Sequence, residues 1–133
     1  MVKVNTNKTQ LDINYIHQIL NNTYWAEGRT IEQVKKSIDN SICFGVYLDQ
    51  RQIGFARVVT DKVIFSYLMD VFIDEEYQGK GYGQLLISEI YNHIDLKHVN
   101  KHYLHTKDAQ KFYLKFGFEV YGLPERFMVK IFT

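Results

Sequence analysis

The chain has 133 residues, the size of one ordinary domain, and 46% of them are apolar, which is enough to bury a core. Sixteen Lys and Arg against fifteen Asp and Glu give a formal net charge of +1, which argues against a non-specific nucleic-acid binder. The single cysteine, Cys43, excludes an internal disulfide framework and a four-cysteine zinc site. Because the sequence has no long apolar run and no apolar signal region, we expect one cytoplasmic domain over residues 1–133 that binds no membrane.

The first forty residues carry two helical patterns. Apolar side chains recur at helical spacing between Asp12 and Tyr24. A second helix should begin after Thr30, because Thr30 and Gln33 form a capping-box pattern in front of an apolar stripe. The two predicted helices are joined by an aromatic and charged loop over residues 24–29.

Three strand patterns follow. Residues 41–48 and 52–60 are rich in β-branched and aromatic side chains, and the tripeptide Asp49-Gln50-Arg51 between them is typical of a hairpin turn. The run from Phe65 to Ile73 is almost wholly apolar and aromatic, which predicts a central strand covered on both faces.

The second half of the chain continues the alternation of helix and strand. Helical spacing covers residues 82–94, a short strand is expected over 101–105, and a helix around Ala109 to Phe116 should end at Gly117 in a left-handed cap. Residues 118–121 and 127–132 are predicted as closing strands. The pattern as a whole indicates an α/β layered protein with a mixed sheet.

The most informative segment is Gln78-Gly79-Lys80-Gly81-Tyr82-Gly83, which lies between a strand and a helix. Glycines allow a ligand to approach the backbone, and the free N–H groups at a helix start bind phosphate oxygens. The spacing fits neither a Walker loop nor a dinucleotide fingerprint. We therefore interpret this glycine loop as a pyrophosphate site of another kind.

Two motifs resemble those of the GCN5-related N-acetyltransferase (GNAT) family. One is the glycine loop, and the other is residues 106–118, where Ala109, Tyr113 and Gly117-Phe118 stand at the family's positions and Thr106 replaces the usual Asn. The resemblance implies a three-layer fold with a twisted, mostly antiparallel mixed sheet of six to seven strands and about four helices. It also implies acetyl-CoA as cosubstrate and a primary amine as acceptor.

The resemblance also implies roles for individual residues. In the family, the third predicted strand bulges and splays at its end, and a Tyr at the position of Tyr113 protonates the leaving thiolate. The residues expected to contact acetyl-CoA are Val71, Ile73, Gln78, Gly79, Lys80, Gly81, Tyr82, Gly83, Thr106 and Ala109.

Deprotonation of the amine requires a base, and a carboxylate among apolar neighbours suits that role. Asp70 is the polar exception in its strand, and Glu27 is the rival carboxylate. Arg57, which by period two shares a strand face with Ile53 and Phe55, requires an anionic partner, either a substrate carboxylate or Asp70. Tyr24 and Trp25 either line the acceptor pocket or pack in the helical layer. The residues expected to bind the acceptor are Tyr24, Trp25, Glu27, Arg29 and Arg57.

The sequence thus favours a cytoplasmic N-acetyltransferase that transfers an acetyl group from acetyl-CoA to a small amine by direct transfer in a ternary complex. Arg29, Arg57 and Arg126 give a weak preference for a carboxylate-bearing acceptor such as an amino acid. We expect no metal, no nucleic acid and no membrane partner, and a homodimer is left open. Two alternatives also stay open: a non-catalytic acetyl-CoA-binding module, and a nucleotide-binding protein that uses the same glycine loop.

Overall fold

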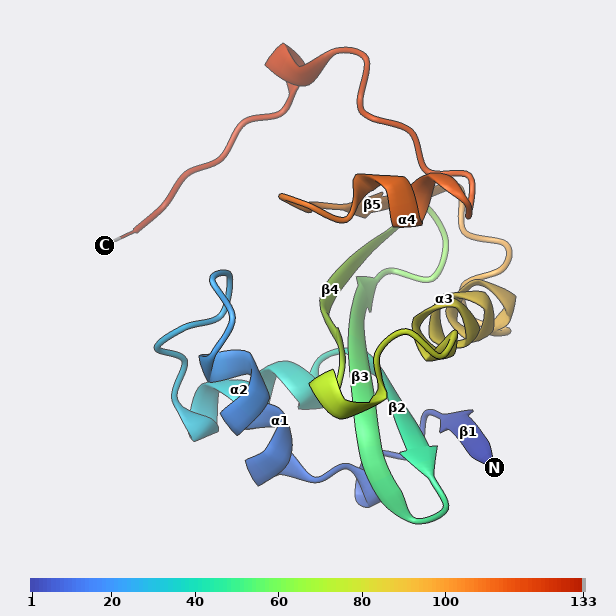
Figure 1. The fold of residues 1–133 in the computed structure, drawn as a ribbon. Coiled ribbons are helices and arrows are strands. Elements are labelled where there is room, and N and C mark those ends of the chain that lie inside the picture. The colour runs from blue at the N-terminus through green and yellow to red at the C-terminus, as the bar shows by residue number, and fades with distance from the viewer. Residues whose placement is uncertain (133) are drawn as a thin grey trace.

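A computed structural model describes residues 1–132 and contains one five-stranded sheet (Figure 1). Its strands, in spatial as well as chain order, are β1 (Val2–Asn5), β2 (Ile42–Leu48), β3 (Arg51–Thr60), β4 (Phe65–Ile73) and β5 (Lys101–Leu104). The first four strands pair antiparallel with their neighbours, and β5 pairs parallel with β4. This mixed sheet confirms the expected α/β class.

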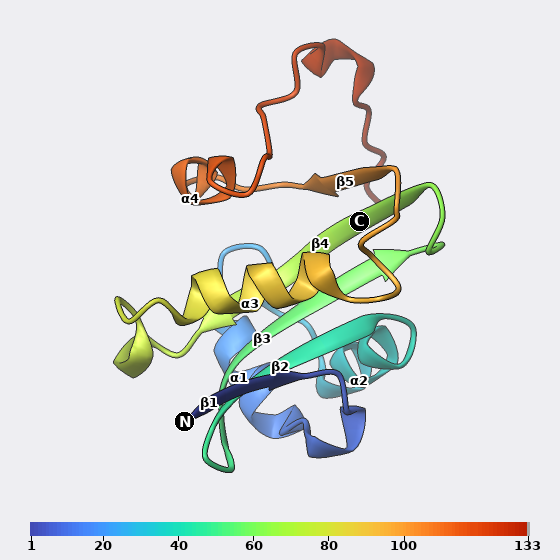
Figure 2. The same cartoon turned by 90° about the vertical axis from the view of Figure 1, so that its right-hand side faces the viewer.

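Helices cover both faces of the sheet, and their bounds are α1 (Ile13–Asn21), α2 (Ile31–Asp39), α3 (Tyr82–Asn92) and α4 (Gln110–Leu114). The first two pack on one face and α3 on the other, while α4 lies beyond the end of β5 (Figures 1 and 2). Short 3-10 turns add η1 (Lys8–Gln10), η2 (Glu75–Tyr77) and η3 (Pro124–Arg126). The three-layer arrangement is the one that the family resemblance implies.

Local signals place most element ends correctly. The capping box forms as predicted, because Thr30 accepts from the Gln33 N–H and the Gln33 side chain accepts from the Thr30 N–H. The hairpin turns through Asp49 and Gln50, with a positive φ of 57° at Asp49. Gly117 has a φ of 91°, so it is the left-handed cap that the sequence predicts.

The expectation that the first forty residues are purely helical is wrong at the N-terminus. Val2 to Asn5 form β1, which pairs with β2 from Val2–Leu48 to Asn5–Gly45. The Val-Lys-Val alternation is a strand pattern, but four residues are too few to separate it from a loop without the partner strand.

The strand pair expected at the C-terminus is also absent from the described residues. Residues 119–132 form no strand, are exposed, and contain only the short turn η3. Figures 1 and 2 show this segment leaving α4 and turning away from the sheet. The sheet therefore has five strands rather than six or seven, because strand propensity alone supplies no hydrogen-bonding partner.

Two bulges decide which side chains face which layer. In β3, Val46 pairs with Gly54 and Tyr47 with Gln52, so Ile53 is an extra residue. Ile53 consequently packs on the α3 side while Phe55 packs on the α1 and α2 side. The period-two expectation that Ile53 shares a face with Arg57 is therefore wrong, because a bulge interrupts the alternation.

The second bulge lies in β4. Phe72 pairs with Phe55 and Met69 with Arg57, so two residues, Asp70 and Val71, stand opposite Ala56. Asp70 has a left-handed backbone with φ 58°. Before the bulge Leu68 is buried against α3, and after it Phe72 is buried against α1 and α2. The bulge thus lets one strand contribute to both hydrophobic layers.

Candidate active site

The glycine loop has the geometry of an open anion cradle. Gly79 and Gly81 have φ values of 78° and 86°, and a Cβ built on either would meet no atom within 4 Å. Gly81 is the N-cap of α3 and offers no side chain to cap it. A ligand can therefore approach the backbone here without displacing a side chain.

The N–H groups of this loop are free to bind such a ligand. None from residue 79 to residue 84 donates to a group within residues 1–132, and the first bond of α3 runs from the Leu85 N–H to the Gly81 carbonyl. The Gln78 side chain donates to the Ile73 carbonyl at 2.9 Å and so ties the loop to the end of β4. Free donors and the positive end of the helix dipole suit a pyrophosphate group.

Strand β4 exposes a backbone edge next to this loop. Its pairing with β5 ends at Leu68 and Leu104, while β4 itself continues to Ile73. From Met69 onward, the edge of β4 that faces away from β3 has no partner strand in the described chain. The expected splay and bulge are both present, and Val71 and Ile73 lie on the unpaired stretch. An extended amide-containing arm, such as pantetheine, fits an edge of this kind.

Asp70 projects from the bulge towards the loop between α1 and α2, and its carboxylate accepts hydrogen bonds from a cluster of three side chains. Its Oδ1 and Oδ2 accept from Nη1 of Arg29 at 2.9 and 2.8 Å, and Oδ2 also accepts from Nε of Arg57 at 2.9 Å. Trp25 Nε1 donates to Oδ1 at 3.2 Å. The Asp70 carboxylate is therefore the anionic partner of Arg57, and its oxygens are occupied by three side chains.

The cluster carries an excess of positive charge. Two guanidinium groups face one carboxylate, and Arg57 makes its further contacts to neutral atoms, Ser41 Oγ at 3.1 Å and Met69 Sδ at 3.4 Å. Arg57 and Asp70 are buried, whereas the Arg29 side chain is 26% exposed. An anionic group of a ligand would therefore meet Arg29 first.

The aromatic loop lies at the surface. Tyr24 and Trp25 are 53% and 43% exposed and stack edge to face, so they do not pack in the helical core. The Tyr24 hydroxyl accepts from the backbone N–H of Lys107 at 3.1 Å, and Lys107 Nζ lies 5.2 Å from the Tyr24 ring centroid. These contacts bridge the α1–α2 loop to the β5–α4 loop. Glu27 in the same loop is exposed.

The second motif forms the short helix α4. Thr106 Oγ1 accepts from the Ala109 N–H at 3.0 Å, so Thr106 organises the start of this helix. Tyr113 is buried, with its ring against Phe112 and Phe118. Burial raises the pKa of Tyr113 to about 12, which keeps the phenol protonated at neutral pH.

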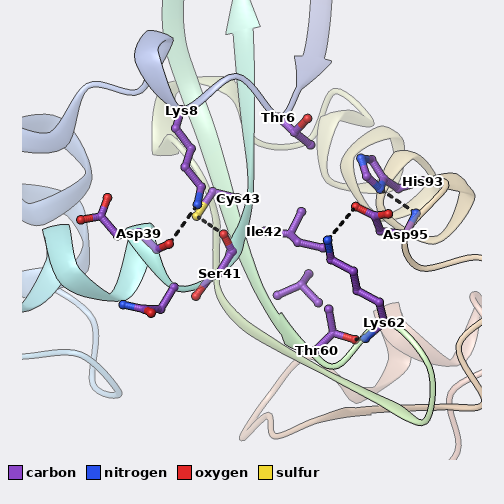
Figure 3. A pocket seen from close by; sticks show the side chains of 12 residues that line it. Thr6, Lys8, Asp39, Ser41, Ile42, Cys43, Thr60, Lys62, His93 and Asp95 are labelled. Atoms are coloured by element: carbon purple, nitrogen blue, oxygen red, sulfur yellow. Dashed lines mark hydrogen bonds and ion pairs between the residues drawn. The ribbon is translucent and has the colours of Figure 1, made fainter.

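A separate cavity of about 490 Å³ lies at the far end of α3 from the glycine loop (Figure 3). Cys43, Lys8 and Lys62 line it, and Lys62 pairs with Asp95 at 3.6 Å. The Cys43 side chain is buried, and burial raises the pKa of its thiol to about 11. Cys43 therefore lies apart from the glycine loop and is a poor nucleophile at neutral pH.

Residues 1–132 contain neither a candidate metal site nor a candidate membrane span. Within residues 1–132, no group of three or more His, Cys, Asp or Glu side chains is arranged to hold a metal ion. In the same part of the chain, the helices are too short or too polar to cross a membrane. The expectation that the protein uses no metal stays a prediction.

Some contacts at this site could not be found from the sequence. Ser41 as a partner of Arg57, and the bridge from Lys107 to Tyr24, join residues far apart in the chain. The bridge uses a backbone N–H, which any residue but proline provides, so no sequence signal marks it.

The comparisons with known proteins agree with this geometry. Residues 39–120 match the acetyltransferase (GNAT) domain, which is more than half of the chain. The chain belongs to the GNAT family. A solved GNAT-family structure from Xanthomonas campestris pv. campestris is 38% identical, with a TM-score of 0.95, over 99% of this chain and 94% of that one.

Two further relatives define the extent of the likeness. An N-acetyltransferase described as ycf52-like, from Prochlorococcus marinus, is 36% identical over 96 residues, which are 68% of this chain and 53% of that protein. The chain thus spans little more than half the length of this curated relative. An acetyltransferase from Clostridium acetobutylicum, solved with acetyl-CoA, has a TM-score of 0.70 at 13% identity over 92% of each chain and shares the fold alone.

Proposed function

We propose that this chain is an N-acetyltransferase that transfers the acetyl group of acetyl-CoA to a primary amine of a small molecule. The observation that carries the proposal is the uncapped glycine loop beside the unpaired edge of β4. The loop offers donors for the pyrophosphate, and Val71 and Ile73 offer backbone groups for the pantetheine arm and the thioester carbonyl. The bound thioester supplies the acetyl group.

Direct transfer in a ternary complex is the mechanism that suits these residues. A covalent route would need a nucleophile, and the single cysteine is buried with a raised pKa. The acceptor is expected beside Asp70, since Trp25 and Arg29 bring the surface loop to that side chain. The acceptor and the acyl donor then approach opposite sides of one bulge.

Tyr113 is proposed to assist departure of the thiolate. With a pKa of about 12 its phenol stays protonated, so it can donate a hydrogen bond to the sulfur as negative charge develops. Full proton transfer to a thiolate whose conjugate acid has a pKa of about 8.5 is uphill, so water completes the protonation.

The proton on the amine requires a separate acceptor. The oxygens of Asp70 already accept from Trp25, Arg29 and Arg57, which favours a positioning role for this residue over that of a base. Glu27, exposed in the same loop, or a chain of waters then takes the proton. The excess positive charge at Arg29 supports the preference for an acceptor that carries a carboxylate.

The binding part of the proposal is tested at the glycine loop. Gly81→Ala puts a methyl group where the pyrophosphate is expected, and we expect the CoA dissociation constant to rise at least about tenfold, a loss of about 1.4 kcal/mol. Gly117→Ala is the matched control, because Gly117 also has a positive φ and open space around its Cβ position. It carries the same backbone strain, and CoA affinity should stay unchanged. If folded Gly81→Ala and Gly117→Ala proteins bind CoA with the same affinity, that result would contradict the proposed site.

The catalytic part is tested with a panel of amines and amino acids, read out by CoA release. Turnover with any amine supports the proposed acetyltransferase activity. Faster turnover of amino acids than of amines without a carboxylate supports the preference for an acceptor that carries a carboxylate. CoA binding without turnover of any amine would assign the chain to the non-catalytic alternative. A larger rise of the melting temperature with ATP or NAD than with CoA would favour the nucleotide-binding alternative.

A further inference from the structure

The last part of the chain leaves an apolar surface in water. We define the C-terminal segment as residues 119–132, all of which are exposed. Its large apolar side chains are between 41% and 89% exposed, and they are Val120, Tyr121, Leu123, Phe127, Met128, Val129, Ile131 and Phe132. A contiguous apolar stretch of this kind marks an interaction site.

The same molecule has a vacant sheet edge. Within residues 1–132, β5 pairs with β4 only, so its outer edge presents unpaired N–H and C=O groups. Unpaired edges of this kind pair readily with another strand. Tyr103, in the middle of β5, is 41% exposed.

A cavity beside β5 shows where additional side chains would fit. It has a volume of about 480 Å³ and lies between His102 of β5, Tyr91 of α3 and residues 116–119, which lead into the C-terminal segment. The Tyr91 hydroxyl is buried there without a hydrogen-bond partner in the described chain. The space and the vacant edge therefore occur at the same place.

The C-terminal segment has the composition of a strand. Phe127, Val129, Ile131 and Phe132 are aromatic or β-branched, the residue types enriched in strands, and the first three would share one face of an extended chain. Six residues extend about 20 Å, which exceeds the about 13 Å of the four residues in β5. The segment is thus long enough to pair along the whole edge.

We propose that two copies of this chain exchange their C-terminal segments, so that residues 127–132 of each copy pair along β5 of the other. Within a single copy, the segment forms hydrogen bonds only inside its own turn, from Arg126 to Leu123 and from Phe127 to Pro124. Figure 1 shows its end far from β5. Because the vacant edge and the free strand belong to the same chain, one exchange satisfies both copies and closes a two-fold dimer.

Cross-linking distinguishes exchange from return of the segment to its own edge. In a Cys43→Ala background, Tyr103→Cys and Val129→Cys are combined and treated with a short bismaleimide, whose flexible arm tolerates a small error in register. Exchange gives a covalent dimer on a denaturing gel. Cross-links confined to single chains, or no cross-link at all, would overturn the proposal.

Light scattering on the full chain supplies the second measurement. We expect a dimer, and the paired substitution Val129→Lys with Ile131→Lys should convert it to a monomer that still binds CoA. The matched control is Val63→Lys with Ile64→Lys, which changes two exposed apolar residues of the β3–β4 loop and should leave the dimer intact. A monomeric wild-type chain, or a dimer that survives the first pair of substitutions, would overturn the proposal. If those lysine variants fail to fold, the cross-link decides alone.

Discussion

Asp70 has a left-handed backbone conformation that few residue types adopt, and its carboxylate binds three side chains. Its φ of 58° is tolerated by Asp and Asn but is costly for β-branched residues. From this position its carboxylate joins a strand residue, Arg57, to two residues of the α1–α2 loop, Trp25 and Arg29. A single side chain thus fixes the loop that is expected to bind the acceptor.

Asp70→Asn tests this positioning role, because Asn keeps the left-handed backbone and removes only the charge. It leaves two guanidinium groups without their counter-charge, one of them buried, so we expect a loss of about 3–5 kcal/mol of unfolding free energy. Adding Arg57→Leu should restore part of that loss, which urea unfolding would measure.

The pH profile separates positioning from general-base catalysis. If Asp70 positions the loop, the turnover lost in Asp70→Asn should be the same at pH 7 and at pH 9. A loss that shrinks at high pH, where more of the amine is already neutral, would make Asp70 the base instead.

Tyr113→Phe isolates the hydroxyl from the ring. The ring contacts with Phe112 and Phe118 stay, so the melting temperature and CoA affinity should hardly change. We expect turnover to fall at least about tenfold, because the variant loses a preorganised hydrogen-bond donor to the sulfur as negative charge develops there. Because burial raises the pKa of Tyr113 to about 12, the wild-type enzyme should lose no activity through this residue below pH 10. Full turnover in the variant would leave Tyr113 with a packing role alone.

Among the elements, those with local signals were predicted and those that depend on distant partners were not. The capping box at Thr30, the glycine loop and the cap at Gly117 are each specified within a few residues, so the sequence places them correctly. The strand β1 was missed because four residues show a strand only when paired with β2.

The candidate site divides in the same way. Asp70 was one of two anionic partners expected for Arg57, the other being a substrate carboxylate, because each of these two side chains interrupts an apolar strand. The contact of Arg29 with Asp70 spans 41 positions and depends on the bulge in β4, which no periodicity announces. The closing strands expected over residues 118–121 and 127–132 do not form in the described chain, because strand propensity alone does not supply a pairing partner.

The neighbours of Gly54 in strand β3 leave no room for a side chain. A Cβ at Gly54 would lie 2.8 Å from Ile73 Cδ1 and 3.0 Å from the Phe72 carbonyl oxygen. We expect Gly54→Ala to lower the unfolding free energy by about 1–3 kcal/mol and also to weaken CoA binding, because the end of β4 must move. Gly122→Ala, with open space around it, should change neither. Unchanged stability in Gly54→Ala would show that β4 accommodates the methyl group.

The whole molecule should be sensitive to alkali. Burial raises the pKa of Cys43 from 9.0 to about 11 and that of Tyr47 from 10.0 to about 12. The unfolded chain ionises these groups first, so their contribution to stability is complete below pH 9 and is lost as pH rises towards 12. Urea unfolding between pH 8 and pH 11 should therefore show a falling free energy, with up to about 1.4 kcal/mol per pH unit from Cys43. Cys43→Ala should flatten the curve between pH 9 and pH 10, and an unchanged slope would contradict this account.

The two adjacent residues of the bulge in β4 belong to the two proposed substrate sites. Val71 belongs to the edge proposed for acetyl-CoA, and its chain neighbour Asp70 belongs to the cluster proposed for the acceptor. A shift of one residue's backbone cannot leave the other in place, so occupation of either site should alter affinity at the other. Thermodynamic linkage then requires the effect to be equal in both directions: whatever factor CoA imposes on acceptor affinity, the acceptor imposes on CoA affinity.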